Sequence, residues 1–257
     1  MLRKIIFPLL LLISCSKETP RETRPLSKHA LMLKKACEYL ISQQAEDGGW
    51  HSKMYGVLRG GQAYTPYIIW ALLQVPDSIY HLPQDKVDLA LEYMRKHTND
   101  EGALGKFDKD VLEYPVYSTA YALRVFIKAG TKEDKALIRT MAHYLTSEQF
   151  DVSRGFTAES LAYGGWGFGE EGLAKGYAGH EDLSHTRRVL EALNDYSRTL
   201  NHPGEEAVSK VTALEFLLVL QRQPVDWRKQ PGVKSEDKRK IFYDGVSVSI
   251  LAQCPAH

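Results

Sequence analysis

The sequence predicts an all-α protein built from repeated helical hairpins, and three observations carry this prediction. First, a helical frame in which an aromatic residue lies three positions after a small or flexible one recurs four times along the 257 residues. Second, a threonine stands at a constant distance before an apolar pair in three of these units. Third, the chain has almost no pattern typical of a strand, and its glycine clusters are typical of turns.

The overall composition is that of an ordinary globular chain. Apolar residues make up 44% and charged residues 25%, which excludes a disordered, collagen-like or multi-span membrane protein. The formal net charge is +1, so there is no excess of positive charge to neutralise phosphates, and nucleic acid is not an expected partner. The length of 257 residues fits either two domains or one domain built from repeats.

Residues 1–14 are predicted to be a bacterial lipoprotein signal peptide. Two basic residues precede the apolar run 5–13, which is too short to span a membrane because a span needs about 20 residues. The run ends in Leu-Ile-Ser-Cys, which resembles a lipobox, so Cys15 is the expected lipidation site. An ordinary secretory signal with a chance cysteine is the alternative. Ser16 follows the cysteine, at the position where an aspartate retains some lipoproteins at the inner membrane. An outer-membrane location is therefore favoured.

The sequence therefore predicts a protein of the bacterial cell envelope whose N-terminal lipid anchor contacts the bilayer. Residues 15–28 contain prolines and many charges, and we expect them to be a flexible tether. Cleavage would remove two basic residues and no acidic one, leaving 31 Lys and Arg against 32 Asp and Glu, a net charge of −1. Cys37 falls in a helical pattern and is expected to be a small buried residue, although export would permit a disulfide with Cys254.

The repeated unit is a helix, a glycine-containing turn and a second helix. In the first unit the helical stretch 35–41 leads into a turn with Gln44, Gly48 and Trp50, and the second helix carries Thr65 six positions before an apolar residue. The frame of the first helix returns at Ala90 with Tyr93, Met141 with Tyr144, and Ala213 with Phe216. The threonine of the second helix returns at Thr119 and Thr186, and Ala63, Tyr117 and Ser184 are expected at the helix starts.

The fourth unit breaks off after its first helix. No helical frame is visible in 246–257, and we expect this segment to be an atypical, disordered tail from a frameshift or a truncated gene. Stacked repeats bury their core only against one another, so the last hairpin would leave an apolar flank exposed. Such a flank would suit a protein partner or self-association.

The stretch 35–50 resembles the QW repeat of squalene-hopene cyclases and related terpene cyclases, in which Gln-x-x-x-Gly-x-Trp follows a helix. Protein prenyltransferase β subunits share the same ring of helical hairpins. The resemblance covers roughly residues 29–245, although the second unit lacks the glutamine and the tryptophan and the third carries an insertion. It implies an incomplete α/α toroid in which the second helices line a central cavity.

The catalytic motifs of these families are missing. The chain contains neither the Asp-x-Asp-Asp acid of the cyclases nor the Asp-Asp-x-x-Asp of ionisation-type terpene synthases. The most similar string, 108–110, is expected to be solvated surface. Prenyltransferase β subunits hold zinc with Asp, Cys and His, but neither Cys37 nor Cys254 stands in that context, so we expect no metal and no cofactor.

The strongest cluster of polar residues is the segment 180–188, at the start of the second helix of the third unit. Its ligand-binding candidates are His180, Asp182, His185 and Arg187, and Asp182 and His185 are also weak catalytic candidates. Helix capping by Asp182 is the simpler interpretation of that residue. The two histidines with Asp182 match no specific metal-ligand spacing.

A second group of candidates is aromatic. In the cyclases, aromatic residues of the cavity hold isoprenoid chains, and the corresponding candidates are Tyr64, Tyr67, Tyr117, Tyr121 and Trp166. Tyr64 and Tyr67 share one helix face, as do Tyr117 and Tyr121. Packing within a helical core is the alternative. The loop 59–62 precedes the second helix of the first unit and is expected at the mouth of the same central cavity.

These observations favour a non-catalytic toroid lipoprotein that binds an apolar or extended ligand, an isoprenoid, lipid or glycan, or a protein partner. The alternative is an enzyme, either a terpene cyclase or mutase of the isomerase or lyase class, or an α/α-barrel polysaccharide lyase or hydrolase. Its acid and base would be Asp182 or Glu181 with His185, beside Trp166 as a stacking residue.

Overall fold

The computed structural model describes residues 26–108, 110–199 and 204–221, and within these ranges the chain is all-α. The described residues form seven α-helices and three short 3-10 helices and no strand. The prediction of an all-α fold is confirmed for this part of the chain. The signal peptide, Cys15, most of the tether, Cys254 and the tail 246–257 lie outside the described residues.

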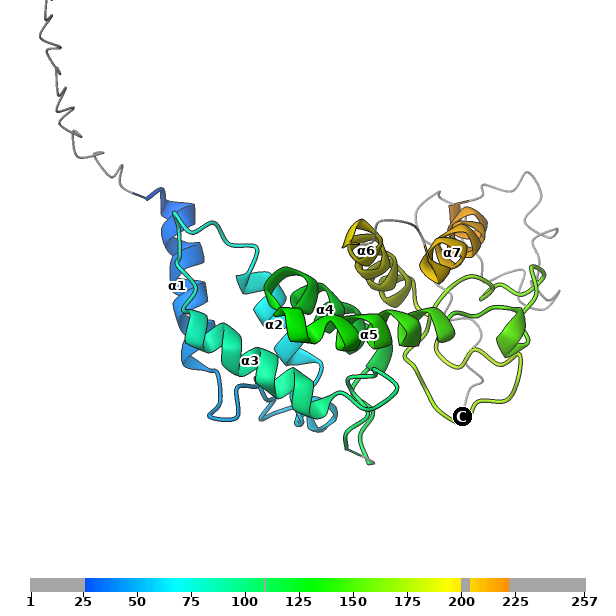
Figure 1. Ribbon diagram of the computed structural model, residues 1–257, viewed down its shortest axis with the longest axis horizontal. Helices are drawn as coiled ribbons and strands as arrows, with labels where there is room; N and C mark the ends of the chain where they lie inside the picture. Colours follow the sequence, from blue (N-terminus) through cyan, green and yellow to red (C-terminus); the bar gives the residue numbers. More distant parts are fainter. Residues whose placement is uncertain (1–25, 109, 200–203, 222–257) are drawn as a thin grey trace, which may run out of the picture.

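The helices follow one another as hairpins. Their bounds are α1 (Lys28–Ser42), α2 (Tyr64–Leu72), α3 (Gln84–His97), α4 (Pro115–Ala129), α5 (Lys135–Ser147), α6 (Leu183–Thr199) and α7 (Glu205–Gln221), with short 3-10 helices at Gly56–Leu58, Lys132–Asp134 and Val152–Arg154. The second helices form one layer, in which α4 packs between α2 and α6. The first helices of the hairpins pack against this layer: α3 contacts α2 and α4, α5 contacts α4 and α6, and α7 contacts α5 and α6. Figure 1 shows α1 at one end of the helical array and α7 toward the other, with α2–α6 between them.

The repeated aromatic frame forms the core between the two layers. In three of the four occurrences of the frame, the small or flexible residue and the aromatic residue that follows it are buried, namely Ala90 and Tyr93, Met141 and Tyr144, and Ala213 and Phe216. The first occurrence, Ala36 and Tyr39 on α1, is exposed instead, because none of the described helices packs over that face. Burial of a large apolar side chain stabilises a fold by about 1.5–3 kcal/mol, so burial of this frame favours the stacking of the hairpins. Cys37 is buried in the same core, as the sequence predicted.

A glycine with positive φ shapes each of the three turns. A Cβ at this position would collide with the backbone of the first helix of the next hairpin, so that only glycine allows the hairpins to approach so closely. The three pairs are Gly48 with Leu89, Gly102 with Thr140, and Gly164 with Thr212.

The repeated threonine holds each turn onto the second helix. Its hydroxyl accepts a hydrogen bond from a turn amide in all three units: Trp50 to Thr65 at 3.0 Å, Leu104 to Thr119 at 2.9 Å, and Trp166 to Thr186 at 2.9 Å. The helix starts differ from the sequence prediction in one case. Helix α4 begins at Pro115 and not near Tyr117, because proline fits the first turn, where no intrahelical N–H bond is lost.

Glutamine and tryptophan add further ties in the first and third turns. The Gln44 amide donates to the carbonyl groups of Gly48 and of Lys86 in α3, both at 2.9 Å. The Gln149 amide donates in the same way to Gly164 (2.9 Å) and to Ser209 in α7 (2.8 Å). The indole N–H groups of Trp50 and Trp166 donate to Leu40 (2.7 Å) and Leu145 (2.6 Å) of the preceding helices.

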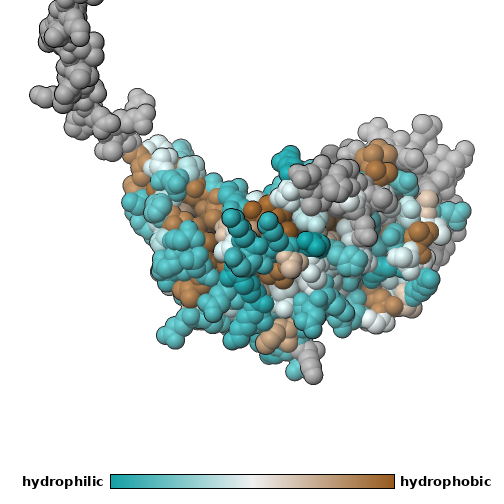
Figure 2. Space-filling view, in the orientation of Figure 1, coloured by the Kyte–Doolittle hydropathy of each residue, from teal (hydrophilic) through white to brown (hydrophobic). Residues whose placement is uncertain are grey.

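Both ends of the helical array expose apolar side chains. At the α7 end they are Val211, Leu214 and Leu218, in line with the predicted apolar flank. At the α1 end they are Leu31, Met32, Leu33 and Tyr39, which the sequence reasoning did not anticipate, and Figure 2 shows hydrophobic residues over this helix. None of the described helices is long and apolar enough to cross a membrane.

Candidate functional site

Four of the predicted site residues come together on the α2–α4–α6 layer. Tyr67 of α2, Tyr117 and Tyr121 of α4, and His185 of α6 form a group that we call the tyrosine–histidine cluster. The ring centres of Tyr67 and Tyr121 are 5.2 Å apart, those of Tyr117 and Tyr121 are 4.9 Å apart, and those of Tyr117 and His185 are 5.2 Å apart. Tyr67 is 44% exposed and Tyr121 is 3% exposed, so the cluster runs from the surface into the layer.

Asp182 fixes the orientation of His185. Its Oδ1 atom lies 2.8 Å from His185 Nδ1 and accepts the backbone N–H of His185 at 2.7 Å, which makes Asp182 the N-cap that the sequence predicted. The hydrogen bond from His185 lowers the pKa of Asp182. An ionised carboxylate only accepts, so Nδ1 carries the proton, and a neutral imidazole then leaves Nε2 as an acceptor. His185 is 8% exposed, and within the described residues its Nε2 atom has no hydrogen-bond partner.

Two residues that the sequence reasoning missed complete the surroundings of this imidazole. The ring of Phe168 lies 4.8 Å from that of His185, and the ring of Tyr114 lies 6.0 Å from it. His180 belongs to the outer part of the same group, because it stacks on Phe168 at 5.0 Å and binds Glu170 at 2.6 Å. Two sequence features could have pointed to these residues. Phe168 lies in a glycine-rich turn, and Tyr114 forms a Tyr-Pro pair at the start of α4.

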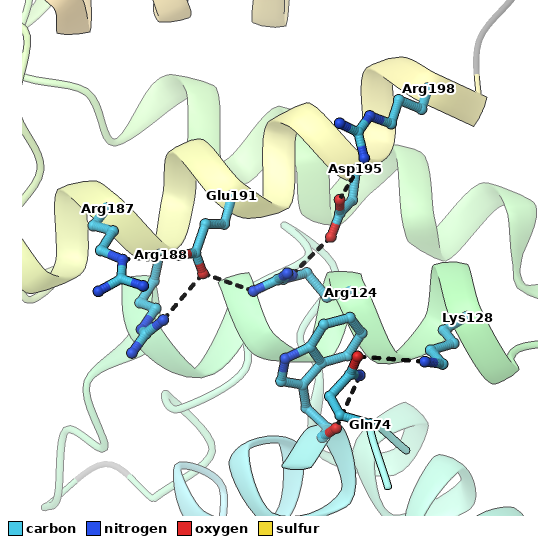
Figure 3. A network of polar contacts seen from close by, with 9 residues as sticks. Gln74, Arg124, Lys128, Arg187, Arg188, Glu191, Asp195 and Arg198 are labelled. Carbon is cyan, nitrogen blue, oxygen red and sulfur yellow. Dashed lines mark hydrogen bonds and ion pairs between the residues drawn. The ribbon is translucent and has the colours of Figure 1, made fainter. Parts of the chain in front are cut away.

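A network of charged side chains continues from the cluster along α4 and α6. Arg124 donates to Glu191 at 2.7 Å and to Asp195 at 2.8 Å, and its guanidinium lies 4.1 Å from the ring centre of Trp70. Figure 3 shows Arg124 of α4 reaching toward both carboxylates of α6. Lys128 donates to Gln74, just after the end of α2, at 3.4 Å, and Trp70 belongs to α2, so the network joins all three helices of the layer.

Arg188 connects this network to the tyrosines. Its guanidinium lies 5.4 Å from the ring centre of Tyr121 and donates to Glu191 at 3.0 Å. Its buried Nε atom has no partner among the described residues. Burial raises the pKa of Tyr121, so this phenol stays protonated at neutral pH, although the nearby Arg188 acts in the opposite direction.

The remaining predicted residues lie outside the cluster. Trp166 is fully buried with its N–H bonded to Leu145, so its indole supports the third turn and does not reach a ligand. Tyr64 packs against the core beside the cluster. Arg187 is exposed on α6 and donates to Glu191 at 2.9 Å.

The loop 59–62 is held by structural contacts. Arg59 pairs with Asp108 at 3.0 Å, and the buried Gln62 accepts the N–H of Gly105 at 2.9 Å. Glu113, which is also buried, accepts the N–H of Ala63 at 3.1 Å, and its burial raises its pKa.

Two cavities lie apart from the cluster. One, of about 440 Å³, opens beside α5 and is lined by Lys132, Lys135 and Arg139 among others. The other, of about 320 Å³, lies within the insertion of the third unit and is lined by Glu159 and Glu181 among others. Burial raises the pKa of Glu181. No group of three or more His, Cys, Asp and Glu side chains in the described part of the chain is placed to hold a metal ion.

Comparisons with protein-family models, with curated proteins and with solved structures find no match to this chain.

Proposed function

We propose that this chain is a lipid-anchored protein of the bacterial cell envelope that binds an apolar or extended ligand without chemical conversion. We propose further that its hairpins form an incomplete α/α toroid with the α2–α4–α6 layer on the inside. The lipobox-like sequence at Cys15 supports the anchor, and the packing of α4 between α2 and α6 supports the inner layer.

One observation carries the binding proposal, the convergence of the tyrosine–histidine cluster from three helices. Ring faces that are partly exposed, as at Tyr67, offer apolar contact area, while the phenol groups and the imidazole supply hydrogen-bonding groups. An isoprenoid chain or a sugar ring would fit such a surface. The absence of the acid motifs of the cyclases from the sequence favours binding over catalysis.

Native mass spectrometry of the full-length protein, extracted from its membrane with detergent, tests this proposal. We expect the wild-type protein to carry an endogenous ligand, and Tyr67→Ala and Tyr117→Ala to lose it. Tyr39→Ala is the matched control, because Tyr39 is an exposed tyrosine on α1, outside the cluster. A ligand that survives both cluster substitutions, or a wild-type protein without any ligand, would refute the proposal.

An enzymatic function is the second candidate. The observation that favours it is the Nε2 atom of His185, which has no hydrogen-bond partner among the described residues. An imidazole whose other nitrogen is held by a carboxylate is the arrangement of a general base. If the ligand identified above is turned over, the Asp182→Asn, His185→Ala double variant should abolish turnover. Unchanged turnover would remove this pair from the chemistry.

A further inference from the structure

We infer that the ligand of the tyrosine–histidine cluster is an anionic glycan, a sugar polymer that carries carboxylate or sulfate groups. This inference rests on the binding function proposed above and names the class of its ligand. It follows from the juxtaposition of the ring faces with the charged network of α4 and α6, which we call the cationic face.

The cationic face holds more positive than negative charge. Among the residues that the structure describes, five cations stand against two carboxylates, a local surplus of three: Arg124, Lys128, Arg187, Arg188 and Arg198 against Glu191 and Asp195. The whole chain has a net charge of only +1, so this surplus is a property of the face and not of the protein. Cations crowded together repel one another, and a bound anion would relieve that repulsion.

The two carboxylates are already shared among several guanidinium groups. Glu191 accepts from Arg124, Arg187 and Arg188 at 2.7–3.0 Å. Asp195 accepts from Arg124 at 2.8 Å and lies 4.0 Å from Arg198. The side chains of Arg187 and Arg198 are 67% and 75% exposed, so both present charge to the solvent. A guanidinium pairs with carboxylate, sulfate or phosphate through two parallel N–H donors.

Rings and cations lie along a single track. The spacing of Tyr117, Tyr121, Arg124 and Lys128 places them on one side of α4, over a length of about 16 Å. Arg188 covers Tyr121 and Arg124 covers Trp70, so cations and ring faces are neighbours along the track.

An anionic glycan offers the matching chemistry, with apolar sugar faces for the rings and repeated negative charges for the arginines. An isoprenoid chain would cover this face without compensating its charges, which is unfavourable. The track therefore distinguishes the two ligand classes that the cluster alone admits.

A matched pair of probes tests the inference on the full-length protein in detergent. The probes are an oligogalacturonate and the same oligosaccharide with its carboxyl groups reduced, which is neutral but has the same ring skeleton. Calorimetry at low salt should give at least about tenfold tighter binding of the acidic probe, and the preference should shrink as salt is added. Arg187→Gln with Arg198→Gln should weaken acidic-probe binding by about fivefold to tenfold. Lys34→Gln, which removes a partly exposed cation from α1, should leave it unchanged.

The outcomes separate this inference from the function on which it rests. Equal affinity for the two probes would overturn the anionic glycan and leave the binding function standing. Binding of phosphatidylglycerol vesicles that needs Arg187 and Arg198, with no binding of either sugar, would also overturn it, because the anion would then be a lipid headgroup. If neither sugar binds and the extracted protein carries no ligand, the proposed function itself fails.

Discussion

The turn of the second hairpin reaches the same backbone geometry as the turns of the first and third hairpins, but with different residues. All three turns have a glycine with positive φ against the next helix and a threonine hydroxyl that accepts a turn amide. The first and third turns add a glutamine and a tryptophan. The second turn has Leu104 where the others have tryptophan, and Asn99 accepts the N–H of Ala103 within the turn at 2.8 Å. Glutamine and tryptophan are therefore not required for the turn itself.

The difference lies in how neighbouring hairpins are joined. Gln44 joins the first turn to α3 and Gln149 joins the third turn to α7, both through neutral amides. Between the second and third hairpins the corresponding tie is an ion pair, in which Arg95 of α3 donates to both oxygens of Asp134 at 2.7 and 2.8 Å. Asp134, just before α5, is only 4% exposed. The tie at the middle joint is thus an ion pair, whereas the corresponding ties at the other two joints are neutral amides.

The largest expected effect comes from the shared glycine. Gly48→Ala, Gly102→Ala and Gly164→Ala each force a Cβ into the backbone of the next helix at a positive φ, and each should cost about 3 kcal/mol or more of unfolding free energy. Urea unfolding of the purified variants measures this. Gly56→Ala is the control, because a Cβ there meets nothing within 4 Å. A tolerated alanine at Gly102 alone would show that the second turn is built differently.

The Arg95–Asp134 tie should respond to pH, and the glutamine ties should not. The hydrogen bonds from Arg95 lower the pKa of Asp134, so this pair stabilises the fold fully above the unfolded pKa of about 3.9 and loses that effect as the pH falls through the folded value. Asp134→Asn should cost about 2 kcal/mol at pH 7, a moderate figure because the Arg95 side chain is 37% exposed.

Unfolding curves recorded between pH 7 and pH 3 measure this difference. The gap between wild type and Asp134→Asn should be constant down to about pH 5 and then narrow toward pH 3. Asp110→Asn, at an exposed carboxylate, should leave the curve unchanged. A gap that is constant with pH would mean that Asp134 acts by packing and not by its charge.

The sequence predicted the parts of the fold that depend on local pattern. The aromatic frame of α3, α5 and α7 is buried, and Asp182 caps α6, because periodicity and capping are set by residues close in the chain. It also selected the four members of the tyrosine–histidine cluster. It missed the Arg95–Asp134 pair and the partners of Arg124, because these contacts join residues from 39 to 71 positions apart and depend on which helices pack together. Trp166 was selected as a ligand-binding residue by its residue type alone, but its side chain is buried in the core and does not reach a ligand.

The smallest expected effect tests the feature that all three turns share. Thr65→Val, Thr119→Val and Thr186→Val keep the side-chain shape and remove the hydroxyl, which leaves the amide of Trp50, Leu104 or Trp166 without its acceptor. Each variant should lose about 1–2 kcal/mol of unfolding free energy, the cost of a buried unpaired amide. Thr140→Val on α5, where the hydroxyl is exposed and bonds its own helix, is the matched control and should change little. Equal losses at the three sites would show that the hydroxyl acts identically with or without a tryptophan, whereas a loss confined to Thr65 and Thr186 would make the indole part of the turn after all.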